Sequence, residues 1–203
     1  FGKEIAHKQQ LLEEAKKKFP DVNFWFWLDC DEIVSQQVIE QMDELGDLMM
    51  DIPQLYGLAF HEVNLWRSNT WCRVTNLFNE GNFVRLWKNL DGLAFEVKEG
   101  LHNAQFPILK DCFIASAPKD CKIIHYGFST TEAIVRKLKT YKAHGQTGYS
   151  WERLQDYMES ESSFVPVPLS CFPPEVRPEK YDEIPKPLPK EEWEKKINEN
   201  GGG

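Results

Sequence analysis

The stretch VNFWFWLDCDEIVS, residues 22–35, joins an apolar run to a cluster of acidic side chains. Its first part, residues 22–28, is aromatic and β-branched and is bounded by turn-forming residues, a pattern typical of a buried strand. Asp29, Asp31 and Glu32 follow it directly. Because ligands of open α/β sheets bind beyond the carboxyl ends of the strands, this position favours a functional site.

The spacing of Asp29 and Asp31 suits a divalent cation. Side chains alternate between the two faces of a strand, so these carboxylates share a face if the extended geometry continues. Two carboxylates held together repel each other, and Mg²⁺ or Mn²⁺ between them relieves that repulsion. A bland alternative is that the acids begin a helix, where the helix dipole favours negative charge. The residues alone leave both interpretations open.

Helical and strand-like patterns alternate along the chain. Helices are predicted at residues 3–19, 35–50, 129–141 and 191–199. Strands are predicted at residues 22–28, 55–66, 82–87 and 122–126. This alternation predicts an α/β fold in which helices flank a mixed sheet.

The composition is that of a globular protein, with 41% hydrophobic and 13% aromatic residues among 203. The net charge of -8 and the lack of a basic stripe predict no nucleic-acid partner. No run reaches the roughly 18 apolar residues that a membrane span needs, so we expect no transmembrane segment. Five cysteines at irregular spacing favour reduced thiols and a cytoplasmic location.

The character of the chain changes near residue 160. Most of its twelve prolines lie within residues 166–189, mixed with Glu and Lys. We therefore expect one domain over residues 1–160 and an extended Pro-rich arm and tail over residues 161–203. The chain starts at Phe1 and not at a methionine, so we expect either a processed product or an excerpt of a longer protein.

Four segments carry a resemblance to a known family. The sequence FWLDCDEI (residues 26–33) resembles the motif in which a hydrophobic strand runs into L-D-A-D-E, found in GT-A-fold glycosyltransferases and especially in family 2. Residues 83–89 (FVRLWKN) resemble the R-L-F-R-N strand of that family. Residues 123–127 (IIHYG) resemble its H-Y strand, and residues 100–103 (GLHN) stand where a His-Glu pair is frequent. The resemblance covers about residues 8–141 and implies a GT-A-like, Rossmann-related sheet.

The resemblance implies roles for several side chains. Asp29 and Asp31 would hold the cation, Mn²⁺ or Mg²⁺, that bridges the diphosphate of a nucleotide-sugar, with Asp31 as the direct ligand. His125 or His102 would be a further metal ligand, although a histidine among apolar neighbours is more often a hydrogen-bonded core residue. Arg85 would clamp a phosphate or an acceptor carboxylate, and its alternative is a salt bridge at the rim of the sheet.

An inverting transfer needs a carboxylate that takes the proton of the acceptor hydroxyl group. Glu32 beside the DxD motif and Glu99 before the GLHN segment are the candidates, because Asn103 replaces the glutamate usual in the family. Glu62 and Glu96 are expected to be solvated surface residues. Tryptophans 66, 71 and 87 lie around the expected acceptor region, where indole rings stack on sugars, although core packing explains most tryptophans.

The function implied is a metal-dependent glycosyltransferase of the hexosyltransferase type, which moves a sugar from a UDP- or GDP-sugar to a carbohydrate or glycan acceptor. The nucleotide-base half of the family fold is absent from this chain, so we expect a preceding segment or a partner chain to complete it. Two alternatives stay open. One is a non-catalytic carbohydrate-binding or scaffolding domain with the same fold, and the other is a metal-dependent phosphoesterase.

Overall fold

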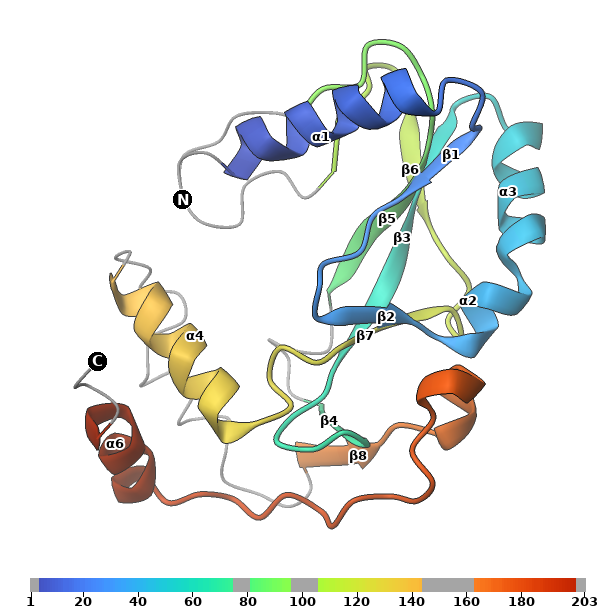
Figure 1. The fold of residues 1–203 in the computed structure, drawn as a ribbon. Helices are drawn as coiled ribbons and strands as arrows, with labels where there is room; N and C mark the ends of the chain where they lie inside the picture. Colours follow the sequence, from blue (N-terminus) through green and yellow to red (C-terminus); the bar gives the residue numbers. More distant parts are fainter. Residues whose placement is uncertain (1–3, 75–80, 96–105, 144–162, 200–203) are drawn as a thin grey trace. The chain divides into compact units, whose positions relative to one another are not determined.

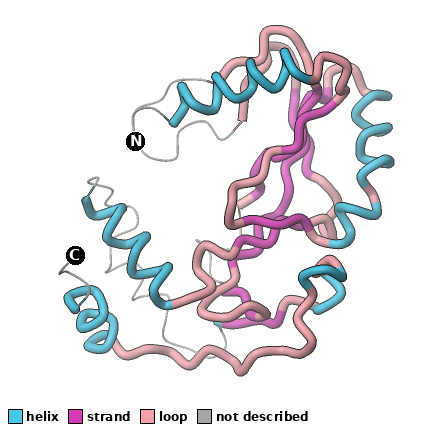
Figure 2. Tube along the Cα trace, in the orientation of Figure 1, coloured by secondary structure: helices cyan, strands magenta, loops and turns pink. Residues whose placement is uncertain are grey.

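The computed structural model describes residues 4–74, 81–95, 106–143 and 163–199 (Figure 1, Figure 2). The chain divides into two compact units. Unit 1 comprises residues 1–29, 37–61 and 82–121, and unit 2 comprises residues 30–36, 62–81 and 122–203. Residues 22–35 are therefore divided between the two units, because the boundary falls between Asp29 and Cys30.

Unit 1 is a mixed sheet with helices on both faces. Its elements are α1 (Glu4–Lys18), β1 (Phe24–Phe26), α3 (Met42–Asp51), the greater part of β3 (Leu55–Asn64), β5 (Asn82–Lys88) and β6 (Phe113–Ser116). β5 pairs antiparallel with both β1 and β3, whereas β6 pairs parallel with β3. The predicted α/β class with a mixed sheet flanked by helices is confirmed.

The alternation of side chains along β1 explains how both faces of this sheet are covered. Trp25 and Trp27 pack into the core that Ile5 and Leu12 of α1 close. Phe24 and Phe26 lie on the other face, beneath α3. Gly46 lets that helix approach closely, since a Cβ added there would lie 3.3 Å from the Phe24 ring.

Unit 2 combines two pairs of strands with two helices. Its elements are β2 (Glu32–Val34), the end of β3, β4 (Trp71–Arg73), β7 (Lys122–His125), α4 (Thr131–Ala143), β8 (Phe164–Pro166), the 3-10 turns η3 (Leu169–Cys171) and η4 (Pro174–Val176), and α6 (Lys190–Glu199). β2 pairs antiparallel with β7, and β4 pairs antiparallel with β8. Trp193 of α6 is buried against Trp66, Phe128 and the apolar face of α4, so α6 is part of the core of the unit.

The predicted helices at 3–19, 129–141 and 191–199 are confirmed, as are the strands at 55–66, 82–87 and 122–126. The seven-residue buried strand at 22–28 is wrong, because β1 has three residues and each is half-buried. Among the described strands β1 pairs with β5 alone, which makes it an edge strand. The helix predicted at 35–50 is two helices, α2 (Gln36–Glu40) and α3, with Gln41 between them.

The C-terminal stretch within unit 2 is held by side-chain contacts. Residues 177–189 contain no helix or strand in the structure before α6 begins. Asp182 accepts hydrogen bonds from the Ser68 hydroxyl at 2.8 Å and from the Asn69 backbone N–H at 2.7 Å. Its own backbone N–H donates to Thr70, and its carbonyl accepts from the Trp71 indole at 2.9 Å. The extended Pro-rich arm expected over residues 161–203 stays a prediction.

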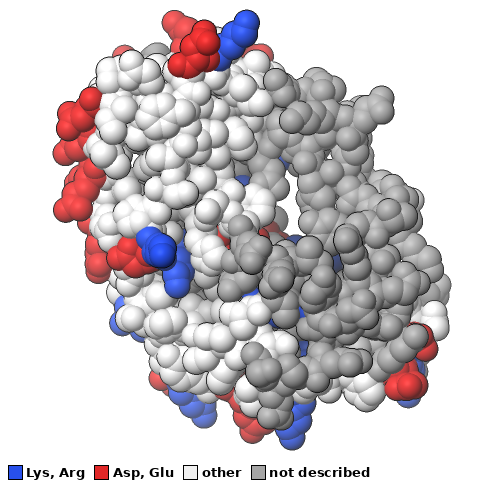
Figure 3. All heavy atoms as spheres, turned by 180° about the vertical axis from the view of Figure 1, so that it is seen from behind, with Lys and Arg blue, Asp and Glu red and all other residues white. Residues whose placement is uncertain are grey.

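None of the described helices combines the length and the apolar character that a membrane crossing needs. On the face shown in Figure 3, the described acidic and basic side chains lie in several small groups, and some of these groups contain both charges. The absence of a nucleic-acid partner stays a prediction.

Candidate functional site

The candidate site is a polar cluster in unit 2 around His125, at the end of β7. Residues 30 and 31 form a turn, and β2 begins immediately after it. Pairing of β2 with β7 places Glu32 directly opposite His125, so both side chains project from the same face. The backbone carbonyl of Asp31 accepts a hydrogen bond of 2.7 Å from the N–H of Tyr126, which fixes the turn against β7.

Both ring nitrogens of His125 have polar neighbours. Nδ1 lies 2.6 Å from Oδ1 of Asn64 and 3.5 Å from Oε1 of Glu62. Nε2 lies 3.3 Å from Oδ2 of Asp31 and 3.1 Å from Nζ of Lys137. Because an amide oxygen only accepts, its position favours a proton on Nδ1. Nε2 faces both the Asp31 carboxylate and the Lys137 ammonium group.

Lys137 is the cationic member of the cluster. It projects from α4, where its Nζ lies 3.7 Å from Oδ2 of Asp31 and 4.2 Å from the centre of the Phe128 ring. Burial lowers its pKa, while the nearby charges of Asp31, Glu62 and Glu32 act in the opposite direction. One ammonium group therefore shares this cluster with three carboxyl groups.

Asp31 is held in its ionised form. The contact with His125 lowers the pKa of its carboxyl group to about 2 and outweighs the effect of burial, and the charge of Lys137 adds to it. The group is also accessible, with 38% of its side chain exposed. An accessible carboxylate that stays charged over the physiological pH range is a suitable ligand for a hard cation.

A glycine allows the cluster to be this compact. A Cβ atom added to Gly127 would clash with Nζ of Lys137, Nε2 of His125 and Oδ2 of Asp31. Any larger residue would therefore push the three polar groups apart.

Asp29 and Arg85 meet in unit 1. Oδ2 of Asp29 lies 3.6 Å from the Arg85 guanidinium group, which is buried, and the Trp27 indole donates to Oδ1 of Asp29 at 3.3 Å. This is the ion pair that the sequence left open as the alternative role of Arg85. The expected continuation of extended geometry from Asp29 to Asp31 is wrong, because the chain turns between β1 and β2.

The donor atoms at Asp31 and His125 fit a divalent cation in their chemistry. Carboxylate oxygen and imidazole nitrogen are both ligands of Mn²⁺. The Lys137 ammonium group lies 3.1 Å from Nε2 of His125 and 3.7 Å from Oδ2 of Asp31. Within the described ranges, no group of three or more His, Cys, Asp or Glu residues is arranged to hold a metal. His102 and Glu99 lie outside the described residues, so the complete ligand set stays a prediction.

Sequence reasoning missed two members of the cluster and misjudged a third. Glu62 is buried at 9% exposure beside His125, so its expected role as a solvated surface residue is wrong. Asn64 gave no signal beyond its place in β3. Lys137 did give one: it lies three residues after Ile134 and one before Leu138, on the apolar face of the predicted helix, where a charged side chain needs partners.

The tryptophans near the expected acceptor region are mostly core residues. Trp66 and Trp87 are almost completely buried, at 0% and 1% exposure. Trp71 is half-buried and its ring lies tilted beside that of Tyr181, with ring centres 6.5 Å apart. Of the three, Trp71 is therefore the one with ring surface left to meet a ligand.

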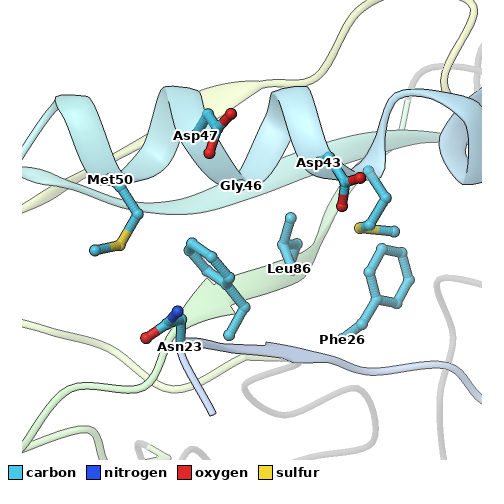
Figure 4. Close-up of a pocket in the computed structure, with 9 residues that line it drawn as sticks. Asn23, Phe26, Asp43, Gly46, Asp47, Met50 and Leu86 are labelled. Carbon is cyan, nitrogen blue, oxygen red and sulfur yellow. The ribbon is translucent and has the colours of Figure 1, made fainter.

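A separate pocket of about 720 Å³ lies in unit 1 between α3 and the sheet (Figure 4). Its floor is apolar, and Asp43 and Asp47 project from α3 one turn apart along its edge. The described residues that line it are Asn23, Phe24, Phe26, Met42, Asp43, Gly46, Asp47, Met50 and Leu86. None of them was predicted as a site residue.

Asp31, His125 and Glu32 are thus brought together in unit 2, and Asp29 and Arg85 are brought together in unit 1. Comparisons of the chain with models of protein families, with curated proteins and with solved structures found no match.

Proposed function

We propose that the chain is a glycosyltransferase domain that binds the diphosphate of a nucleotide-sugar, with a divalent cation, at Asp31 and His125. The observation that carries this proposal is the contact of Asp31 Oδ2 with His125 Nε2 at 3.3 Å. These two residues come from the L-D-C-D-E and H-Y segments, which are 94 positions apart and carry the resemblance independently. Their meeting in one cluster supports a shared role.

The chemistry follows from the charge that develops on the leaving group. When the bond between sugar and phosphate breaks, negative charge grows on the nucleoside diphosphate. A bound Mn²⁺ or Mg²⁺ would supply Lewis-acid stabilisation of that charge. Asp31 contributes a carboxylate whose pKa is lowered to about 2, and the contact of Asn64 with Nδ1 orients the His125 ring so that its Nε2 faces Asp31.

The acceptor side of the reaction rests on the prediction from sequence. Glu32 is 8% exposed and lies opposite His125, where a proton acceptor for the sugar hydroxyl would be close to the donor site. Glu99 is the other predicted base. A carbohydrate acceptor, the cytoplasmic location and a further segment or partner chain that supplies the nucleotide-base pocket are parts of the same proposal.

Calorimetric titration tests the proposal. Mn²⁺ with UDP, and with GDP for comparison, is titrated into the wild-type chain and into the Asp31→Asn variant. We expect metal-dependent nucleotide binding to weaken by at least about tenfold in Asp31→Asn, because a charged ligand is replaced by a neutral amide of the same shape. The Asp43→Asn variant, which removes an exposed carboxylate from the unit 1 pocket, should bind like the wild type.

Equal binding by Asp31→Asn and the wild type would contradict the proposed site. No binding of either nucleotide by the wild type would contradict binding of the donor diphosphate by this chain alone and would favour a non-catalytic domain. Hydrolysis of simple phosphate esters without sugar transfer would favour the phosphoesterase alternative.

A further inference from the structure

The cation position of the cluster already has a positively charged neighbour. Nζ of Lys137 lies 3.1 Å from Nε2 of His125 and 3.7 Å from Oδ2 of Asp31. These are the two atoms that the proposed function assigns to the metal. A divalent cation bound by both atoms would have to lie close to Nζ, where like charges repel strongly.

We propose that the Lys137 ammonium group is an internal counter-ion, which occupies the cation position of the metal-free site and is displaced when a divalent cation binds. The inference rests on the proposed function in one respect, because it takes Asp31 and His125 as the ligands. Lys137 would compete with the divalent cation for Asp31 and His125, a role that neither the motif nor the resemblance assigns.

The surroundings of Lys137 explain why it stays in this position when no metal is bound. Its ammonium group balances part of the charge of Asp31, Glu32 and Glu62, and it also lies over the face of Phe128 at 4.2 Å. The side chain is 24% exposed, so its end has a route to solvent. A lysine stem is flexible, and a displaced ammonium group regains hydration.

The same charges explain why a divalent cation can displace it. The Lys137 ammonium group lies near the carboxyl groups of Asp31, Glu62 and Glu32, whose charges also attract a divalent cation. A divalent ion supplies two charges at the point where Lys137 supplies one. Lys137 therefore sets a threshold for metal binding without abolishing it.

The experiment measures Mn²⁺ alone, without nucleotide, by the electron paramagnetic resonance signal of the free ion. Wild type is compared with Lys137→Met, which keeps the length and apolar stem of the side chain but removes its charge. We expect Lys137→Met to bind Mn²⁺ at least about tenfold more tightly, because a like charge beside the ligand atoms is gone. Lys137→Arg keeps the charge and should bind no more tightly than the wild type.

Arg136→Met is the matched control, because it removes a positive charge from the exposed side of the same helix. It should leave Mn²⁺ affinity unchanged within about twofold, since exposed charges are screened. Equal affinity in Lys137→Met and the wild type would overturn the inference, as would a lack of Mn²⁺ binding in both. Tighter Mn²⁺ binding by Lys137→Met with no nucleotide binding would uphold the counter-ion and reject the glycosyltransferase proposal.

Discussion

Gly127 provides a test of the site at the scale of a single residue. In Gly127→Ala the new methyl group would meet the ends of Lys137, His125 and Asp31. The Lys137 and Asp31 side chains are flexible and can move aside. We therefore expect the fold to survive, with the free energy of unfolding lowered by about 1 kcal/mol, while the cluster opens. Metal-dependent nucleotide binding should weaken, which the calorimetric titration measures together with the thermal midpoint.

Gly46→Ala is the matched control for this prediction. It lies in α3 of unit 1, where an added Cβ would touch only the Phe24 ring, and alanine favours a helix over glycine. It should retain nucleotide binding. If Gly127→Ala binds nucleotide as tightly as Gly46→Ala, the compact cluster is not needed for binding.

Residues of the site differed in how well they could be predicted. Asp31 and His125 stood in motifs with recognisable neighbours, and the structure brings their side chains together. Glu62 and Lys137 lie in segments whose pattern is that of an ordinary strand and helix. Their partners come from other elements, so only the packed structure reveals that their charges are needed there.

At the scale of elements, the segment at residues 177–189 carries a prediction. We propose that Asp182 ties this segment to the turn at residues 68–71 and so braces α6 against its core. Asp182→Asn should lower the free energy of unfolding by about 1 kcal/mol, since an anionic acceptor of two hydrogen bonds becomes a neutral one. The measurement combines the thermal midpoint with the rate of proteolytic cleavage within residues 177–189, which should rise.

Glu183→Gln is the control, because it makes the same chemical change at the exposed neighbouring residue. Cleavage of Asp182→Asn at the rate of Glu183→Gln would show that Asp182 does not brace the segment.

The elements themselves were largely predictable, and the exceptions have physical causes. The long apolar patterns of α1, α4 and β3 gave correct positions, because each buries a continuous face. The apolar residues of β1 suggested a longer and deeper strand, but an edge strand leaves part of its surface uncovered. The interruption at Gln41 could not be predicted, because the apolar spacing of residues 35–50 continues across it.

At the scale of the whole molecule, the chain passes from one unit to the other several times. Unit 2 takes residues 30–36 from the middle of the motif, residues 62–81 and the C-terminal part from residue 122 onward. Local patterns carry no information about such long-range association, so the sequence predicted the mixed sheet but not this division. The two aspartates of the DxD motif are almost adjacent in sequence. In the structure, however, Asp29 pairs with Arg85 in unit 1, whereas Asp31 contacts His125 in unit 2.

We propose that a nucleotide diphosphate and its cation bind at Asp31 and His125. The most direct measurement is the ¹⁵N spectrum of the imidazole side chains while Mg²⁺ and UDP are added, since the chain has only five histidines. The His125→Gln variant assigns the signal. We predict that the signals of both His125 nitrogens shift to saturation with bound nucleotide. Saturable UDP binding that leaves the His125 signals unchanged would contradict the account.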